Sequence, residues 1–234
     1  MNVDGKHIIV TGGSLGIGKE TAISLAKKGA KVLVTGRSQD RLEKAFVGID
    51  CQTIAFDIGD TANIDNNVEK CLDLLDGKVD VLVNNAGIGE RKYLDELNID
   101  SFMNVFNVNV FGLALFTKGI VPAMKNNNGG TIINIGSTAS LKGYQTGSIY
   151  ASSKFAVRCL TQCWQAELRP HNIRVCQINP SEVTTAFGNP DRIERDEVHN
   201  KLTSKEIAHA ITSAIEMDDR GFINELNIWA TNPF

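Results

Sequence analysis

The sequence predicts an α/β protein with one doubly wound, parallel sheet of seven strands and helices on both faces. Short apolar runs alternate with longer segments of helical periodicity along the chain, which is the pattern of repeated β–α units. The first apolar run ends in a glycine-rich turn that opens a helix, and no linker or internal repeat interrupts the alternation. We therefore expect a single domain over residues 1–234, with strand order 3-2-1-4-5-6-7.

The expected strands are short runs of branched apolar residues, at 7–11, 31–35, 52–56, 79–83, 131–135, 173–178 and 222–228. The expected helices have apolar residues at helical spacing, at 19–28, 39–46, 64–75, 99–124, 148–168 and 204–217. The charged and irregular stretch 186–202 is expected to form a small lid over the site.

Composition and charge exclude several classes of function. The 234 residues carry a formal net charge of −3, without a basic stripe, so neither nucleic acid nor an anionic membrane is expected as a partner. No apolar run is expected to reach the length of a membrane span. Met1 leads almost directly into the first strand, so no signal peptide is expected. These features predict a cytoplasmic protein.

The five cysteines are an odd number without zinc-type spacing, which predicts a reduced protein with no metal site. Cys159 and Cys163 share one face of the expected helix 148–168. They are interpreted as small, buried apolar filler, and metal binding is the alternative.

The turn after the first strand reads TGGSLGIG over 11–18, with glycines at Gly12, Gly16 and Gly18. The spacing differs from G-x-G-x-x-G. A glycine turn between a strand and a helix lets the backbone approach a pyrophosphate, and the helix N-terminus faces its negative charge. The alternative is a turn without a ligand. We expect nucleotide binding.

The end of the second strand indicates which nucleotide. An NAD-binding fold places an acidic residue there to hold the ribose 2′-hydroxyl, whereas this chain has Gly36 followed by Arg37. A guanidinium suits a 2′-phosphate, and Ser14 can add a hydroxyl contact. The alternative is a solvated arginine before the next helix. We expect NADP(H) rather than NAD(H).

Tyr150 and Lys154 are four residues apart, so a helix stacks them on one face. A phenol titrates near pH ~10, and a fixed ammonium beside it would lower its pKa toward the working range. Ser137 ends the expected strand at 131–135. A strand ending in a hydroxyl and a helix carrying this pair can bring three groups to one carbonyl. The alternative is an accidental pair on a helix surface.

Taken together, the chain resembles the short-chain dehydrogenases/reductases over residues 5–230. The motifs that match, in order and at the family's spacings, are Thr11 to Gly18, Asp57, Asn84 to Gly87, Asn109, Ser137, Tyr150, Lys154 and Pro180 to Thr185. The resemblance implies a Rossmann fold and an NADP(H)-dependent reduction of a small-molecule carbonyl.

The resemblance also implies roles for the four catalytic residues. Tyr150 would protonate the substrate oxygen as hydride arrives from the nicotinamide, and Ser137 would donate a hydrogen bond to that oxygen. Lys154 would lower the tyrosine pKa and bind the nicotinamide ribose. Asn109 would hold a water that links the lysine to bulk solvent; an exposed polar residue is the alternative. A mid-helix asparagine disfavours a regular helix, so an irregularity is expected there.

For the cofactor, the resemblance implies that Asp57 would bind the adenine amino group and that Val183 and Thr185 would hold the carboxamide and phosphates. The full set of expected cofactor contacts is Gly12, Ser14, Leu15, Gly16, Ile17, Gly18, Arg37, Asp57, Ile58, Asn85, Ala86, Gly87, Tyr150, Lys154, Pro180, Val183 and Thr185. Ser181 stands where the family usually has glycine, which is expected to shift the backbone near the nicotinamide.

Within the family, the closest resemblance is to NADPH-dependent 3-oxoacyl-[acyl-carrier-protein] reductases. Those enzymes dock the carrier through two arginines, and this chain has Asn128 and His171 at the matching positions, neither reliably cationic. Residues 223–228 also resemble reductases of small carbonyls and pterins. A non-catalytic NADP-binding regulator is a further alternative, disfavoured because both the tyrosine and the lysine are present.

A homo-oligomer, a tetramer or a dimer, is expected from two helices that carry apolar residues on more than one face. These residues are Phe102, Val105, Phe106, Leu113 and Phe116 in 99–124, and Phe155, Leu160 and Trp164 in 148–168. The resemblance implies that the same helices pair between subunits. The alternative is that both faces are buried within one subunit.

Overall fold

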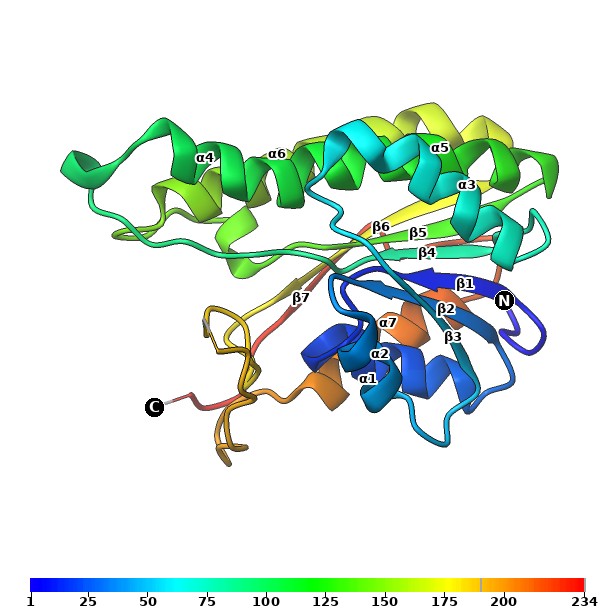
Figure 1. Ribbon diagram of the computed structural model, residues 1–234, viewed down its shortest axis with the longest axis horizontal. Helices are drawn as coiled ribbons and strands as arrows, with labels where there is room; N and C mark the ends of the chain where they lie inside the picture. The colour runs from blue at the N-terminus through cyan, green and yellow to red at the C-terminus, as the bar shows by residue number, and fades with distance from the viewer. Residues whose placement is uncertain (190, 234) are drawn as a thin grey trace.

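The computed structural model describes residues 1–189 and 191–233, and its framework is one seven-stranded parallel sheet between two layers of helices (Figure 1). The strand order is β3-β2-β1-β4-β5-β6-β7, and all neighbours pair in parallel. The predicted doubly wound Rossmann topology is therefore confirmed. The strands are β1 (His7–Val10), β2 (Lys31–Gly36), β3 (Cys51–Ala55), β4 (Val81–Asn84), β5 (Gly130–Ile135), β6 (Ile173–Pro180) and β7 (Glu225–Ile228).

The helices divide between the two faces of the sheet (Figure 1). One face is covered by α1 (Gly16–Ala26), α2 (Gln39–Ala45) and α7 (Ser204–Glu216). The other is covered by α3 (Ile64–Leu74), α4 (Ile99–Phe106), α5 (Leu113–Asn126) and α6 (Ser148–Leu168). Helix α1 begins earlier than expected, within the glycine turn, and β7 begins later, at Glu225 opposite Gln177 of β6.

The strands are apolar on both sides because helices cover both faces of the sheet. In β1, Ile8 and Val10 pack in the cluster that includes α1 and α7, whereas Ile9 packs in the cluster that includes α3 and α5. All three side chains are fully buried. This arrangement explains why the strands appear in the sequence as unbroken apolar runs, and it brings the carboxyl ends of β1, β4, β5 and β6 to one edge.

The expected helix 99–124 consists of α4, a π-helical turn (Asn107–Gly112) and α5, which follow one another without a break. The irregularity expected at Asn109 is confirmed. Its side chain donates to the carbonyl of Ile88 (2.9 Å) and to the Ser153 hydroxyl (3.0 Å), and it accepts from the Ile88 N–H (2.9 Å). Widened turns of this kind are frequent at functional sites.

The continuous helix 99–126 is long and apolar enough to cross a membrane by length and composition, with a mean hydropathy of 1.4 in its most apolar 18-residue window. The expectation that no apolar run reaches this length is therefore wrong. Half of its most apolar window is buried inside the protein. Phe116, Ile120 and Met124 are fully buried in the core between α5 and the sheet, and a buried core helix satisfies the same criteria.

A buried polar network links β4, β5, α5 and α6. The amide of Asn84 donates to Thr117 Oγ1 and to Asn134 Oδ1, both at 2.9 Å, and the amide of Asn134 donates to Thr161 Oγ1 at 2.8 Å. Each threonine hydroxyl also donates to a carbonyl of its own helix. Asn84 Oδ1 has no hydrogen-bond partner within the described part of the chain. Buried polar groups of this kind favour a single strand register.

The five cysteines are free. Cys71 and Cys176 are buried, but Cys159 and Cys163 are exposed, so the interpretation of this pair as buried filler is wrong. They lie on the outward side of α6, away from the sheet. Across residues 1–189 and 191–233, no group of three or more His, Cys, Asp or Glu side chains could hold a metal ion.

Candidate active site

A cavity of about 910 Å³ opens at the carboxyl ends of the strands, where ligands bind in open α/β sheets. Of the residues predicted to form the site, all but Gly18 and Asn109 line it. Gly18 instead packs against the Asn85 amide and the carbonyl of Gly12, and Asn109 lies behind Ile88. Nearly all of the predicted site residues therefore meet in one cavity, although they make up less than half of the residues that line it.

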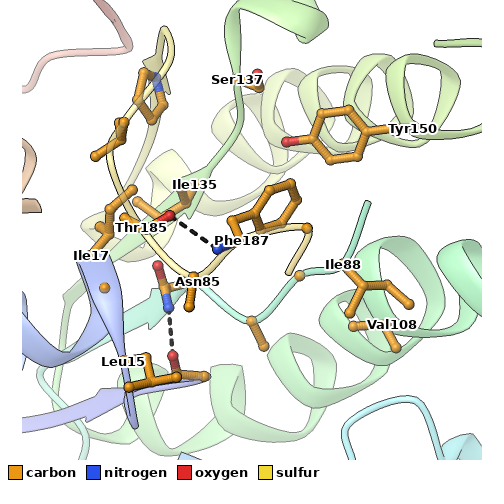
Figure 2. Close-up of a pocket in the computed structure, with 18 of the residues that line it drawn as sticks. Leu15, Ile17, Asn85, Ile88, Val108, Ile135, Ser137, Tyr150, Thr185 and Phe187 are labelled. Carbon is orange, nitrogen blue, oxygen red and sulfur yellow. Dashed lines mark hydrogen bonds between the residues drawn. The ribbon is translucent and has the colours of Figure 1, made fainter. Parts of the chain in front are cut away.

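The glycine turn is fastened to the end of β4. Gly12 has a φ of 66°, and a Cβ there would lie 2.7 Å from the Cα of Ala86, so only glycine fits this close approach. The Asn85 amide donates to the carbonyls of Thr11 (3.0 Å) and Gly12 (2.9 Å), and Thr11 Oγ1 accepts from the N–H groups of Asn85 and Ala86. In Figure 2 the Asn85 side chain points at this turn. The turn is therefore preformed.

The first turn of α1 already holds a negative group. The N–H of Gly16 donates to Oε1 of Glu194 at 2.7 Å, and the carboxylate occupies the position at a helix N-terminus that favours anions. Gly16 has a φ of 57° and packs directly beneath the Thr185 side chain. This carboxylate stands in for a phosphate, so the turn fits the pyrophosphate of a dinucleotide.

The far end of the cavity, beyond β2 and β3, carries positive charge. Gly36 and Arg37 line the cavity there as predicted, together with Arg41. Asp57 also lines this end, and its Oδ1 accepts from the N–H of Gly59 at 2.8 Å. Both arginine side chains are exposed. This end therefore offers guanidinium groups to an anion.

The catalytic candidates meet at the opposite end. Ser137 follows β5, and Tyr150 and Lys154 lie one turn apart on α6. In Figure 2 the Tyr150 hydroxyl points into the cavity between Ser137 and Phe187. The Lys154 Nζ lies 5.8 Å from the centre of the Tyr150 ring and donates to the carbonyl of Ile135 at 2.7 Å. A hydroxyl, a phenol and an ammonium thus face one space.

Burial dominates the ionisation of this pair. It raises the pKa of Tyr150 to about 12, with the Ser137 hydroxyl acting in the opposite direction, and it lowers the pKa of Lys154 to about 8. The shift at the phenol is opposite to the expected one. Lys154 lies over the tyrosine ring and gives its hydrogen bond to a backbone carbonyl, so its charge does not offset the loss of solvation at the phenol oxygen.

Asn109 lies outside the cavity lining, behind Gly87 and Ile88 at the Tyr150 end. A Cβ placed on Gly87 would lie 3.3 Å from Asn109 Oδ1 and 3.7 Å from Lys154 Nζ, so the three residues converge. The asparagine side chain holds both backbone groups of Ile88. It therefore fixes the chain that leaves β4 next to the lysine.

Other residues of the site have weak signals in the sequence. The Phe187 ring packs 5.5 Å from the Tyr150 ring, and Tyr144 and Trp229 also line the cavity. These aromatic residues lie in loops or beyond the last strand, where no periodicity predicts a position. Arg41 follows Arg37 by four residues, a spacing that could have suggested a pair.

Comparisons with known proteins agree with this geometry. The model of the short chain dehydrogenase family matches residues 6–196. An NADP-dependent 3-hydroxy acid dehydrogenase from Schizosaccharomyces pombe is 32% identical over 229 residues, covering 91% of this chain and 88% of that protein. An uncharacterized oxidoreductase from Thermotoga maritima is 33% identical over 240 residues, covering 95% and 94%.

Solved structures give the same result. The alcohol dehydrogenase from the archaeon Thermococcus sibiricus, complexed with 5-hydroxy-NADP, has a TM-score of 0.88 and 29% identity, covering 97% of each chain. A structure described as a putative betaketoacyl-ACP reductase has a TM-score of 0.85 and 27% identity, with the same coverage. With these likenesses added to the geometry of the site, the chain belongs to the short chain dehydrogenase family and is an oxidoreductase of that family.

Proposed function

We propose that this protein is an NADP(H)-dependent reductase that converts a ketone into an alcohol. The observation that carries the proposal is the convergence of Ser137, Tyr150 and Lys154 at one end of a cavity whose other end carries Gly36 and Arg37. The NADP dependence of the S. pombe relative and the NADP derivative in the T. sibiricus structure support the choice of cofactor.

The dinucleotide, when bound, supplies the hydride. Tyr150 donates its hydroxyl proton to the substrate oxygen, and its pKa of about 12 keeps that proton in place at neutral pH, which suits reduction. Ser137 donates a hydrogen bond to the same oxygen as negative charge develops, an effect worth roughly 3 kcal/mol. Lys154, with a pKa of about 8, would bind the ribose and help to return a proton to the tyrosine, and the water proposed at Asn109 would link the lysine to bulk solvent.

The chain's own groups suit each part of the cofactor. The N–H of Gly16, which holds a carboxylate here, would take the pyrophosphate, and Arg37 the 2′-phosphate. Asp57 would bind the adenine. Val183 and Thr185, both nearly buried beside the glycine turn, would hold the nicotinamide carboxamide and the phosphates.

The substrate end favours a small acidic or aromatic carbonyl over a carrier-bound one. Its walls are aromatic, and Arg91 and Lys142 lie at its edge, where they can attract a carboxylate. Asn128 and His171 lie near the amino ends of β5 and β6, at the edge of the sheet opposite Tyr150. We therefore rank free 3-oxo acids and other small carbonyls above acyl-carrier thioesters, with pterins as the second candidate.

The test is NADPH oxidation, followed by absorbance, against a diketone, a free 3-oxo acid, an acetoacetyl thioester and a pterin. We expect turnover with at least one small carbonyl. Binding of NADPH without turnover of any substrate would instead support the non-catalytic regulator. Tyr150→Phe in parallel shows whether any turnover arises at this site.

We also propose a homo-oligomer that pairs through α4, α5 and α6. Of the residues predicted to face a partner, Val105, Leu113 and Phe116 are buried within the chain, whereas Phe155 is 42% exposed. Ile99, Met103 and Phe111 are also exposed on these helices. An apolar face of this kind needs a partner. A monomeric mass in light scattering at micromolar concentration would contradict the proposal.

A further inference from the structure

A third arginine lies at the end of the cavity that carries Arg37 and Arg41. Arg192, from the stretch 186–202, lines the cavity together with Arg37 and Arg41. Partial burial, and then the positive charges of these two residues, lower the pKa of Arg192, and only Glu194 acts in the opposite direction. Three guanidinium groups from two segments of the chain, 37–41 and 186–202, therefore share one corner.

One nitrogen of the partly buried Arg192 guanidinium has no hydrogen-bond acceptor among the described residues. Its Nε is buried and has no hydrogen-bond partner among residues 1–189 and 191–233. An unsatisfied buried donor costs about 1–3 kcal/mol, and more when it is charged. The nearby carboxylate of Glu194 is engaged by the N–H of Gly16. Among the described residues, the corner thus has more guanidinium groups than carboxylates, and the Glu194 carboxylate is bonded elsewhere.

The backbone holds this side chain in place at a cost. Arg192 has a φ of 58°, a left-handed conformation that is unfavourable for a non-glycine residue. Its N–H donates to the carbonyl of Asn189 at 3.1 Å, and the Asn189 amide donates to the carbonyl of Ile193 at 3.1 Å. Strain that local hydrogen bonds maintain is a feature of ligand-binding positions.

The segment is also anchored independently of Glu194. The Arg195 guanidinium donates to the carbonyls of Val183 (2.6 Å) and Thr185 (3.2 Å) and to Glu182 (3.1 Å). Glu194 can therefore leave the N–H of Gly16 by rotation of its side chain while the backbone near Arg192 stays in place.

We propose that Arg192 is a specificity-determining residue that binds the 2′-phosphate of NADP(H) together with Arg37 and Arg41. The inference rests on the proposed NADP(H) dependence and adds a residue from outside the dinucleotide-binding half of the fold. A 2′-phosphate carries enough charge and acceptor oxygens for several guanidinium groups, and it would supply an acceptor for the unpaired Nε of Arg192. NADH and ADP, without that phosphate, gain nothing from Arg192.

The test compares dissociation constants for four ligands on the full chain: NADPH, NADH, 2′,5′-ADP and ADP, by calorimetry. The last two measure the same contact without any reaction. For Arg192→Gln we expect NADPH and 2′,5′-ADP to bind about tenfold more weakly, the loss of one charge-assisted hydrogen bond. NADH and ADP should change less than about twofold. Arg220→Gln, at an exposed arginine bonded to Asp218 in a remote turn, is the matched control and should change none of them.

The outcomes separate this inference from the proposed function. If the wild type binds NADPH no better than NADH, the cofactor assignment and the role of Arg192 both fail. If the wild type prefers NADPH and Arg192→Gln keeps the full preference, only the role of Arg192 fails. Equal weakening of all four ligands would indicate a structural role and also overturn it. If melting curves show that the glutamine variant does not fold, Arg192→Lys is measured instead. A smaller loss confined to the two 2′-phosphate ligands is then expected, and an unselective loss or none overturns the proposal.

Discussion

The two ends of the cavity are built differently. At the catalytic end, Lys154 is only 4% exposed, and its neighbours come from a strand end and a long helix packed on the sheet. At the opposite end, which carries the three arginines, Arg37 and Arg41 are exposed, and Arg192 comes from an irregular segment. Charges in the interior are scarcely screened by salt, whereas exposed ones are. We therefore expect rate to depend on buried geometry, and cofactor choice to depend on surface charge and on ionic strength.

The largest expected effect is at the buried end. Tyr150→Phe removes the proton donor and leaves the ring that packs against Phe187. We expect turnover to fall about 100-fold or more, because acid–base groups supply at least that, while NADPH affinity changes little. Retention of more than about a tenth of the wild-type rate would exclude the proposed role.

Lys154→Met tests the burial of the lysine charge through the pH dependence of the free energy of unfolding. The folded-state pKa of Lys154 is about 8, below its ordinary 10.5, so from pH 8 to 10.5 the unfolded chain binds a proton that the folded chain does not. Wild-type stability should therefore rise with pH across this window relative to Lys154→Met, by up to about 3 kcal/mol. Urea unfolding of both proteins at about pH 7 and about pH 10 measures the difference, and equal pH dependence would contradict the burial of this charge.

At the exposed end the expected effect is on affinity. The wild type should bind NADPH at least about tenfold tighter than NADH, since a charge-assisted hydrogen bond is worth roughly 1.5–3 kcal/mol. Combining Gly36→Asp with Arg37→Gln adds a repelling carboxylate and removes a guanidinium, and should reverse the order. Titrations of both cofactors on both proteins test this, and an unchanged preference in the double variant would place discrimination elsewhere.

The smallest expected effect is on the affinity for both cofactors, and it is expected at Glu194, next to the glycine turn. Glu194→Gln keeps a hydrogen-bond acceptor for the N–H of Gly16 but removes the charge that competes with the pyrophosphate. We expect NADPH and NADH to bind a few-fold tighter, about threefold, and by the same factor, since both carry the pyrophosphate. Fluorescence titration at one salt concentration is sufficient. A change in the NADPH-to-NADH ratio would show that Glu194 acts on Arg192 rather than on the glycine turn.

The sequence predicted the strand order and the part of the cavity wall that stands next to strand ends, because the parallel sheet brings those ends together. Asn109 was predicted to disturb its helix for a local reason, and it does. The partners of Arg192 and Phe187 could not be predicted because the stretch 186–202 has no periodicity. The pKa of Tyr150 could not be predicted because it depends on burial and on a hydrogen bond that Lys154 gives to Ile135.

The buried asparagine–threonine network has a consequence for redesign. Asn84 and Asn134 are register partners in β4 and β5, and a slip of one residue would turn one of them to the opposite face. Each buried group left unpaired would cost about 1–3 kcal/mol. These two strands are therefore aligned without help from the loops that follow them, at 88–98 and 138–147. Grafted loops of other lengths should be tolerated there, which makes this chain a scaffold on which new substrate specificities can be built.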